Sequence, residues 1–286
     1  LGWCIAWPAF HLFRVRVSDA CARIREVFGD RYSPREVRRI AWLSMRNFTF
    51  TAIESLRMPK LTRETATALI DIGDFQRLRD HAATGKGAIL VVPHTGNWEM
   101  AGVAAHLFGL PMFLIVGKQR NLLVDAYLNR MRGVSGMEII PRDSSTMFKK
   151  VVRNLREGKF LAFMTDLRSR TPGMRVQFLG KEANVVAGMA VFARLGNVPV
   201  FPVVVTRIGW ARHKWEFFDP VCPDPALDRD PDAQRMTQAV MDIYDRAIRA
   251  QPEQYFWFNK RWVLDPLRVE ECRVPGVEGV PATPDT

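Results

Sequence analysis

Short apolar segments alternate with segments of helical spacing between residues 88 and 208, and this alternation constrains the fold more than any other feature. The apolar segments are too short for helices, and the intervening ones carry apolar residues every three or four positions. Strands that alternate with helices of about ten to fifteen residues are typical of a largely parallel β-sheet covered on both faces. The expected strands are 88–92, 112–117, 137–141, 159–166 and 198–208, and the expected helices are 97–109, 121–133, 144–158 and 184–197.

The flanking segments extend the same domain. Residues 34–58 are predicted to form an amphipathic helix that Ser33 caps and Pro34 opens. After the alternation, we expect a strand over 213–221, a surface helix over 232–250 and an aromatic-rich core strand over 252–262. We therefore predict one α/β domain, with a central, mostly parallel or mixed sheet flanked by helices, over residues 31–265. Residues 1–30 form a helical N-terminal extension, and residues 266–286, rich in Pro and Gly, a disordered tail.

The first sixteen residues are mostly apolar and rich in aromatic side chains. A membrane-spanning helix needs about 20 apolar residues, so this segment is too short, and Pro8 interrupts it. Two interpretations remain: a helix packed in the core, or an interfacial anchor whose Arg14 and Arg16 meet lipid phosphate. Because the chain begins with Leu1 and not Met, we expect a fragment, and we assign residues 1–30 to a membrane-associated segment that is the remainder of a truncated anchor.

The chain is strongly basic, with 41 Lys and Arg residues against 30 Asp and Glu residues and a net charge of +11. This excess predicts an anionic partner, and nucleic acid, anionic lipid, a phosphorylated substrate and an acidic protein all fit. The four cysteines lack CxxC spacing, so they indicate neither a zinc site nor a disulfide framework and favour a reducing compartment.

His94 and Glu99 lie where the strand 88–92 ends and the next helix begins. In a continuous helix, five steps of about 100° would place the two side chains some 140° apart. They can meet only if the helix starts after His94, and Asn97, a preferred N-cap residue, supplies that start. A carboxylate on one imidazole nitrogen would raise the basicity of the other, so the pattern predicts a general base made of His94 and Glu99.

Polar residues also follow the next three strands. Lys118 and Asn121 follow the second strand, Arg142 the third, and Asp166 and Arg168 the fourth. The carboxyl ends of parallel strands meet at one edge of a sheet, so these residues predict an anion or oxyanion site beside His94. Surface charge with helix caps is the alternative interpretation.

Other catalytic templates are missing from the sequence. There is no G-x-S-x-G elbow, no Walker loop and no HExxH motif, and the remaining histidines lack metal-ligand spacing, so no metal is expected. The aromatic and basic residues of 252–262 also match single-stranded nucleic acid binding, but their continuous run favours a core strand with its basic end at a rim.

Five blocks in a fixed order resemble the late acyltransferases of lipid A biosynthesis, the lauroyl and myristoyl transferase family. That family also includes a mycobacterial phosphatidylinositol mannoside acyltransferase, and the resemblance implies the glycerolipid acyltransferase-like fold of the lysophospholipid acyltransferase-like superfamily. The blocks are "HTGNWE", "VGKQRNLLVDAYLNRMR", "LREGKFLAFMTD", "VQFLGKEANVVAGMAVFARLGNVPVFPV" and "PEQYFWFNKRW", and the resemblance covers residues 15 to 265. The resemblance implies transfer of a fatty acyl group from a thioester, on acyl carrier protein or coenzyme A, to a hydroxyl of a membrane glycolipid or phospholipid. It also implies a location on the cytoplasmic face of the bacterial inner membrane, no cofactor beyond the acyl thioester, and no nucleic-acid partner.

The same resemblance assigns roles to the candidate residues. His94 would deprotonate the acceptor hydroxyl, and Glu99 would orient the His94 imidazole and stabilise its charge, without a covalent acyl-enzyme. The expected substrate-binding residues are Asn97, Lys118, Asn121, Arg142, Asp166 and Arg168, with Asn121 and Arg142 as donors near the thioester or the acceptor phosphate and Asp166 as a site-shaping acid.

Two segments depart from the family pattern. "DLRSR" follows the fourth strand where the lipid A enzymes have Gln or His, an acid and a glycine, and "NVVAG" replaces a threonine-rich segment. Both leave the acceptor lipid open. A basic nucleic-acid-binding protein and a lipid-binding relative without catalysis are the rival functions.

Overall fold

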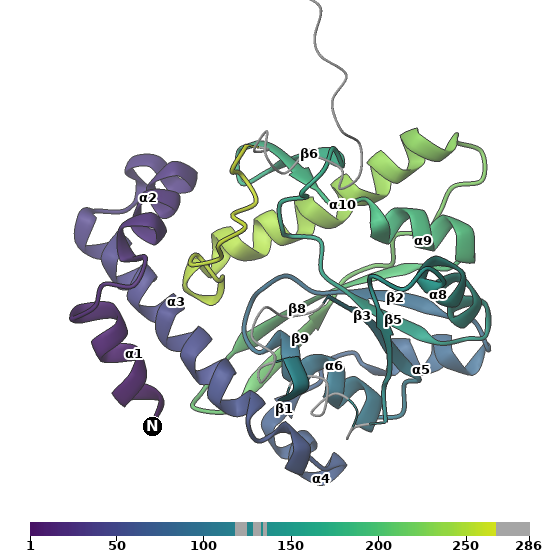
Figure 1. Ribbon diagram of the computed structural model, residues 1–286, viewed down its shortest axis with the longest axis horizontal. Coiled ribbons are helices and arrows are strands. Elements are labelled where there is room, and N and C mark those ends of the chain that lie inside the picture. Colours follow the sequence, from purple (N-terminus) through teal and green to yellow (C-terminus); the bar gives the residue numbers. More distant parts are fainter. Residues whose placement is uncertain (118–124, 128–132, 134–135, 267–286) are drawn as a thin grey trace, which may run out of the picture.

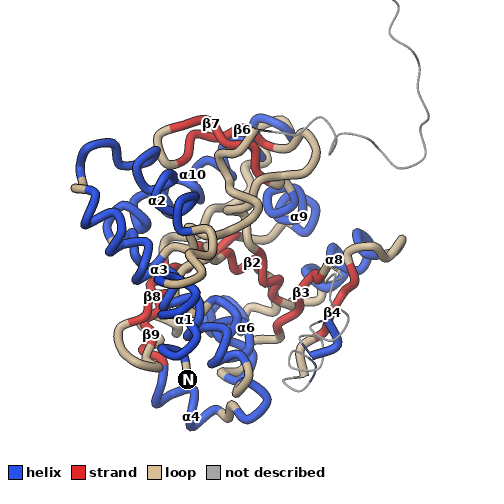
Figure 2. The backbone as a smooth tube through the Cα atoms, turned by 60° about the vertical axis from the view of Figure 1, so that its left-hand side comes forward, coloured by secondary structure: helices blue, strands red, loops and turns tan. Residues whose placement is uncertain are grey.

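The computed structural model describes residues 1–117, 125–127, 133 and 136–266. Its centre is a seven-stranded sheet with the strand order β1-β9-β8-β2-β5-β3-β4 (Figures 1 and 2). Neighbouring strands run parallel except β8 and β9, which are antiparallel because a short hairpin loop joins them. This is the predicted mostly parallel α/β sheet. The strands are β1 (Ile70–Asp71), β2 (Ala88–Val91), β3 (Met112–Val116), β4 (Glu138–Pro141), β5 (Phe160–Phe163), β8 (Val200–Arg207) and β9 (His213–Phe217).

Helices cover both faces of the sheet, as the alternation predicts. Ile89 and Val91 of β2 pack into the core under one set of helices, whereas Ala88 and Leu90 pack into the core on the other face. Successive strand residues point to opposite faces, so a strand that is apolar throughout needs both covers. The first face is covered by α8 (Met147–Arg156), α9 (Gly188–Gly196) and α10 (Arg229–Ala250), and the second by α4 (Arg63–Leu69), α5 (Gln76–Ala83) and α6 (Trp98–Leu107).

Three N-terminal helices pack together at one end of the molecule (Figure 1). They are α1 (Gly2–His11), α2 (Val17–Phe28) and α3 (Pro34–Ser55), and short 3₁₀ turns follow α2 at Gly29–Arg31 and α3 at Met58–Lys60. Ser33 caps α3 in a reciprocal box with Glu36, which confirms the predicted helix start.

Helix α1 is buried in part, as a helix packed in the core would be, and the interfacial anchor stays a prediction. Ala6 and Phe10 are buried, while Trp3 is 41% and Trp7 49% exposed. No helix among the described residues has both the length and the apolar character needed to cross a membrane.

Two predicted elements are wrong. Residues 184–185 belong to strand β7 (Lys181–Val185), which forms a hairpin with β6 (Met174–Phe178), so the helix starts only at Gly188. The hairpin turn is Leu179-Gly180, both with positive φ, as a two-residue turn requires. Residues 252–262 are not a strand: a 3₁₀ turn over Pro252–Gln254 leads into irregular backbone with one bridge, between Tyr255 and Thr95.

Helix α10 confirms the surface helix predicted over 232–250, and its buried face carries Met236, Val240 and Tyr244. The expected strand at 213–221 is β9, which ends at Phe217. The expected helix 121–133 and the tail after residue 266 lie outside the described residues, apart from 125–127 and 133.

Candidate active site

The turn between β2 and α6 carries the first candidate residues. Asn97 caps α6, since its Oδ1 accepts a hydrogen bond from the Met100 amide at 2.9 Å. Gly96 has a φ of +55°, and a Cβ there would lie 2.5 Å from the Val205 carbonyl oxygen, so only glycine fits. The helix therefore starts after His94, as predicted, and the imidazole belongs to the turn.

The carboxylate that contacts the His94 ring comes from Asp166. The Asp166 Oδ1 lies 2.8 Å from the imidazole Nδ1, and Oδ2 accepts a hydrogen bond from the His94 backbone amide at 2.7 Å. The Asp166 side chain is fully buried and that of His94 is 12% exposed. The two residues meet because β2 and β5 are parallel neighbours, with Val91 opposite Phe163, so both strands end at the same edge.

This contact corrects the pairing expected from the five-residue spacing. Among the ion pairs of the described residues, the one that His94 forms is with Asp166, and Glu99 instead lies in the wall of a cavity. The Nδ1 partner sits 72 residues further along the chain, and a local spacing argument cannot detect such a contact.

The tautomer of His94 follows from this geometry. A carboxylate only accepts hydrogen bonds, so Nδ1 carries the proton that points to Asp166. The lone pair is then on Nε2, which is the arrangement of a general base.

The environment of Asp166 is buried and contains two tyrosines. Burial first, and the nearby Asp166 charge second, raise the pKa of Tyr244 and of Tyr255 well above the ordinary value. Both phenols therefore stay neutral at working pH.

The aromatic segment that follows α10 packs against the turn that carries His94. The Phe256 amide donates to the His94 carbonyl at 3.0 Å, and Thr95 forms a β-bridge with Tyr255. Arg23 of α2 in turn donates to the Trp257 carbonyl at 2.8 Å. These hydrogen bonds connect the segment 252–262 to the turn on one side and to α2 on the other. Trp257 and Trp262 of this segment are buried, so they cannot stack on nucleic-acid bases.

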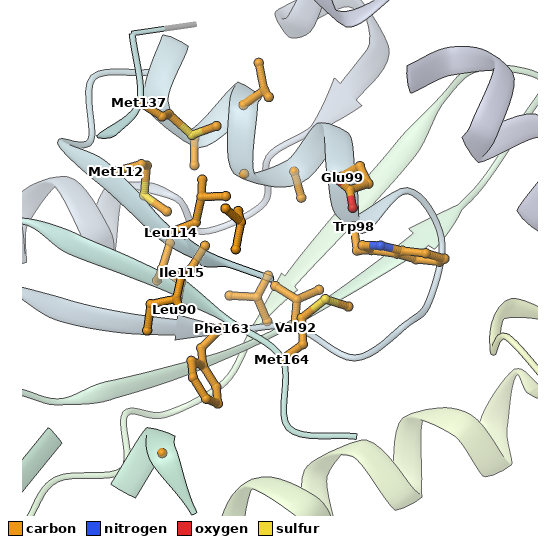
Figure 3. A pocket seen from close by; sticks show the side chains of 18 of the residues that line it. Leu90, Val92, Trp98, Glu99, Met112, Leu114, Ile115, Met137, Phe163 and Met164 are labelled. Carbon is orange, nitrogen blue, oxygen red and sulfur yellow. The ribbon is translucent and has the colours of Figure 1, made fainter. Parts of the chain in front are cut away.

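A cavity of about 540 Å³ opens beside this turn (Figure 3). The Trp98 ring stands 5.0 Å from the His94 ring and forms part of the cavity wall. Figure 3 shows Trp98 and Glu99 at one end and Met112 and Met137 at the other. The wall is mostly apolar, and its charged residues among those described are Glu99, Arg142 and Arg261. A volume of this size with few polar groups is typical of a binding site for a small, largely apolar ligand.

Of the other predicted site residues, Arg142 lies in the cavity wall and Arg168 does not. Arg142 follows β4 and lies in the cavity wall, beside Gly117. Arg168 is buried, and its Nη1 donates to the Pro266 carbonyl at 2.9 Å, so it braces the end of the domain. Lys118 and Asn121 lie outside the described residues.

Asn97 has a structural position, which corrects its expected role in substrate binding. It is fully buried, its Oδ1 caps α6, and its Nδ2 donates to the Glu54 Oε2 at 2.7 Å. Both ends of the amide are used within the protein, so we leave Asn97 out of the substrate site.

Arg261 is a cavity residue that the sequence analysis did not single out; the available signal was the basic end of the segment 252–262. Within the described ranges, no cluster of three or more His, Cys, Asp and Glu side chains could hold a metal ion.

Comparison with known proteins gives related sequences over most of the chain. The family model described as "Bacterial lipid A biosynthesis acyltransferase" matches residues 1–263. Phosphatidylinositol mannoside acyltransferase of Mycolicibacterium smegmatis is 24% identical over 218 residues, which cover 74% of this chain and 68% of that protein. Lipid A biosynthesis acyltransferase of Haemophilus influenzae is 24% identical over 187 residues, which cover 64% of this chain and 56% of that protein.

Among solved structures, the 1-acyl-sn-glycerophosphate acyltransferase of Thermotoga maritima covers 87% of this chain and 93% of its own, with 13% identity and a TM-score of 0.41. That score is too low to carry an argument about the site.

Proposed function

Since the chain belongs to the bacterial lipid A biosynthesis acyltransferase family and is therefore an acyltransferase, we propose that it moves a fatty acyl group from a thioester to a hydroxyl of a membrane glycolipid. The observation that carries the mechanism is the contact of 2.8 Å between His94 Nδ1 and the buried Asp166 carboxylate.

In the proposed reaction, His94 Nε2 takes the proton of the acceptor hydroxyl while the hydroxyl oxygen attacks the thioester carbonyl carbon. The tetrahedral intermediate collapses with cleavage of the C–S bond. The imidazolium returns its proton to the leaving thiolate, so the products are an ester and a thiol and no acyl group is held by the protein. A positioned general base contributes roughly 10²- to 10⁴-fold to the rate.

Asp166 supports both proton transfers. Its fixed charge holds the proton on Nδ1 and stabilises the imidazolium that forms when Nε2 is protonated. The role of imidazole partner that we propose for Asp166 is more specific than the role of site-shaping acid that the sequence resemblance implies.

The cavity is the proposed site for the acyl chain. Its apolar wall extends from Trp98, beside the base, towards Met112 and Met137 (Figure 3). An acyl chain placed there would bring its carbonyl carbon to the His94 end, and each buried methylene would contribute about 0.8 kcal/mol to binding.

The charged residues of the cavity wall are proposed to handle the polar groups of the substrates. Arg142 and Arg261 suit the oxygen of the tetrahedral intermediate or an acceptor phosphate, because guanidinium groups donate in a fork that matches such oxygens. Glu99, at the start of α6, is proposed to orient the acceptor hydroxyl towards Nε2. Lys118 and Asn121 remain predictions from sequence resemblance.

We further propose that the protein works at a membrane surface, on the cytoplasmic face of the inner membrane, with acyl carrier protein or coenzyme A as carrier of the thioester. Trp3, Trp7 and Phe13 are exposed, Arg14 and Arg16 follow α1 in the chain, and Trp210 lies 6.5 Å from Trp3 and is 74% exposed. Exposed tryptophans with neighbouring arginines suit the bilayer interface, where the ring lies among headgroups and the cation meets phosphate.

The test is mass spectrometry of membrane lipids from cells that express the wild type, His94→Ala or no protein. The wild type is expected to shift one lipid class by one acyl mass, and His94→Ala to abolish the shift. His81→Gln, which changes a histidine on α5 outside the cavity, is the matched control. An unchanged shift with a folded His94→Ala protein would refute the proposed base.

A further inference from the structure

A buried cluster of polar side chains lies beneath the catalytic turn and takes no part in the proposed chemistry. It joins Glu54 of α3, Asn97 of the turn, Arg207 of β8 and His213 of β9. The Asn97 residue is fully buried, and the side chains of Arg207 and His213 are 4% and 1% exposed. Ionic groups are rarely placed so deeply unless each one has a partner.

The Glu54 carboxylate is the centre of the cluster. Its Oε2 accepts from Asn97 Nδ2 at 2.7 Å, from Arg207 Nη2 at 2.8 Å and from His213 Nε2 at 3.1 Å. Burial disfavours the charged form, but the hydrogen bonds from His213 and Arg207 outweigh it and lower the Glu54 pKa to about 2. The carboxylate is therefore ionised at any working pH, and it can only accept hydrogen bonds.

This acceptor decides which way the Asn97 amide faces. An amide has a donor end and an acceptor end of nearly the same shape, and an unconstrained asparagine can adopt either orientation. The carboxylate of Glu54 requires the NH₂ end, so Oδ1 is left facing the Met100 amide, where it caps α6. Glu54 thereby selects the orientation that starts the helix immediately after the catalytic turn.

The cluster is also connected to Gly96 by hydrogen bonds through Thr51. Arg207 Nη2 donates to Thr51 Oγ1 at 3.3 Å, and Thr51 Oγ1 donates to the Gly96 carbonyl at 2.9 Å. The turn is thus fixed on one side by Asp166, which binds the His94 amide, and on the other by residues that converge on Glu54.

We propose that Glu54 is a positioning residue for the His94 base: its carboxylate orients Asn97 and holds the turn so that Nε2 faces the reacting hydroxyl. This inference rests on the proposed function for its kinetic consequences and on the cluster itself for its structural ones.

The test uses two single variants and their combination. Glu54→Gln removes the charge and places a donor or a weaker acceptor against the Asn97 amide. Asn97→Asp keeps a good N-cap but sets two carboxylates against each other across a contact now 2.7 Å long. In the double variant, the glutamine NH₂ that would donate to the aspartate lies at the Oε2 position, which Arg207 Nη2 and His213 Nε2 also face as donors, so the cluster is not restored.

Each single variant is expected to lower kcat for acyl transfer by 10- to 100-fold, with the KM for the thioester within about twofold, because the base is displaced while the cavity is unchanged. Because both substitutions break the same contact, the double variant is expected to be no more than about threefold slower than the slower single variant. Glu26→Gln, which breaks the exposed ion pair of Glu26 with Lys181, is the matched control and should leave kcat unchanged.

Two results would overturn the proposal: a double variant as slow as the product of the two single effects, or a folded Glu54→Gln protein with wild-type kcat. His94→Ala separates these failures from that of the proposed function, because an active His94→Ala protein refutes the base whatever Glu54 does. The ¹⁵N resonances of the His94 imidazole, assigned with the His94→Ala variant, give a readout without substrate. They should shift or broaden in both single variants and in the double one, and unchanged resonances in Glu54→Gln would contradict the proposal.

Discussion

Substituting Asp166 by Asn changes the protonation of His94 while it changes the shape of the site very little. The Oδ2 position faces the His94 backbone amide, which is a donor at 2.7 Å, so the new side chain must place its carbonyl oxygen there. Its NH₂ group then faces Nδ1 at the Oδ1 position, now 2.8 Å away. A donor at that position favours the tautomer with the proton on Nε2, which cannot act as a base towards the acceptor hydroxyl.

The expected loss is about 10³- to 10⁴-fold in kcat, or about 4 to 5.5 kcal/mol at 1.36 kcal/mol for each factor of ten. The fold should persist, because replacing a buried carboxylate by its isosteric amide removes the desolvation penalty along with the charge-assisted bonds. The assay is steady-state acyl transfer, with the thermal unfolding midpoint and the imidazole ¹⁵N shifts measured on the same samples. Asp230→Asn, in an exposed pair with Arg229, is the control. An Asp166→Asn enzyme with more than a tenth of wild-type kcat, or one whose His94 keeps its proton on Nδ1, would refute the assignment.

Three further predictions follow from other parts of the structure. Gly102 lies in the cavity wall on α6, so Gly102→Leu should exclude about two or three methylenes of the acyl chain. Measured over a series of acyl donors, kcat/KM for long donors should fall by about tenfold or more relative to short ones. An unchanged chain-length preference would place the acyl chain elsewhere. Trp210→Glu should reduce co-sedimentation with vesicles containing anionic lipid several-fold with the fold intact, and equal binding would exclude this surface. Burial lowers the pKa of His213 below 6.5, so the neutral form of His213 stabilises the fold above pH 6.5, and this contribution is lost as the pH falls towards the lowered pKa. Glu54 has a pKa of about 2, so its ionised form stabilises the fold above about pH 4.5, and that contribution is lost between about pH 4.5 and 2. Unfolding midpoints should therefore fall from pH 6.5 downwards, and His213→Gln should remove the first part of that fall; a parallel pH profile in this variant would contradict the assignment.

Local patterns predicted the parts of the fold that depend on nearby residues. The alternation of apolar strands and amphipathic helices predicted the parallel sheet, because burial on both faces imposes a period on each element. Ser33 and Asn97 predicted helix starts because the side chain of a cap residue accepts a hydrogen bond from the backbone amide three residues further on. The hairpin at 174–185 was missed although its alternation is regular, because the apolar run after it resembled the start of a helix.

The sequence alone thus determined the class of fold and placed His94 at a strand end, since periodicity, capping and turn chemistry act over a few residues. Only the tertiary structure decided which acid contacts His94, which residues brace its turn and where a cavity opens. Asp166, Glu54 and Phe256 approach this turn from β5, α3 and the segment after α10, and no spacing in the chain relates them. Their contacts depend on which strands are neighbours and on where each strand ends, and that order exists only once the sheet has formed.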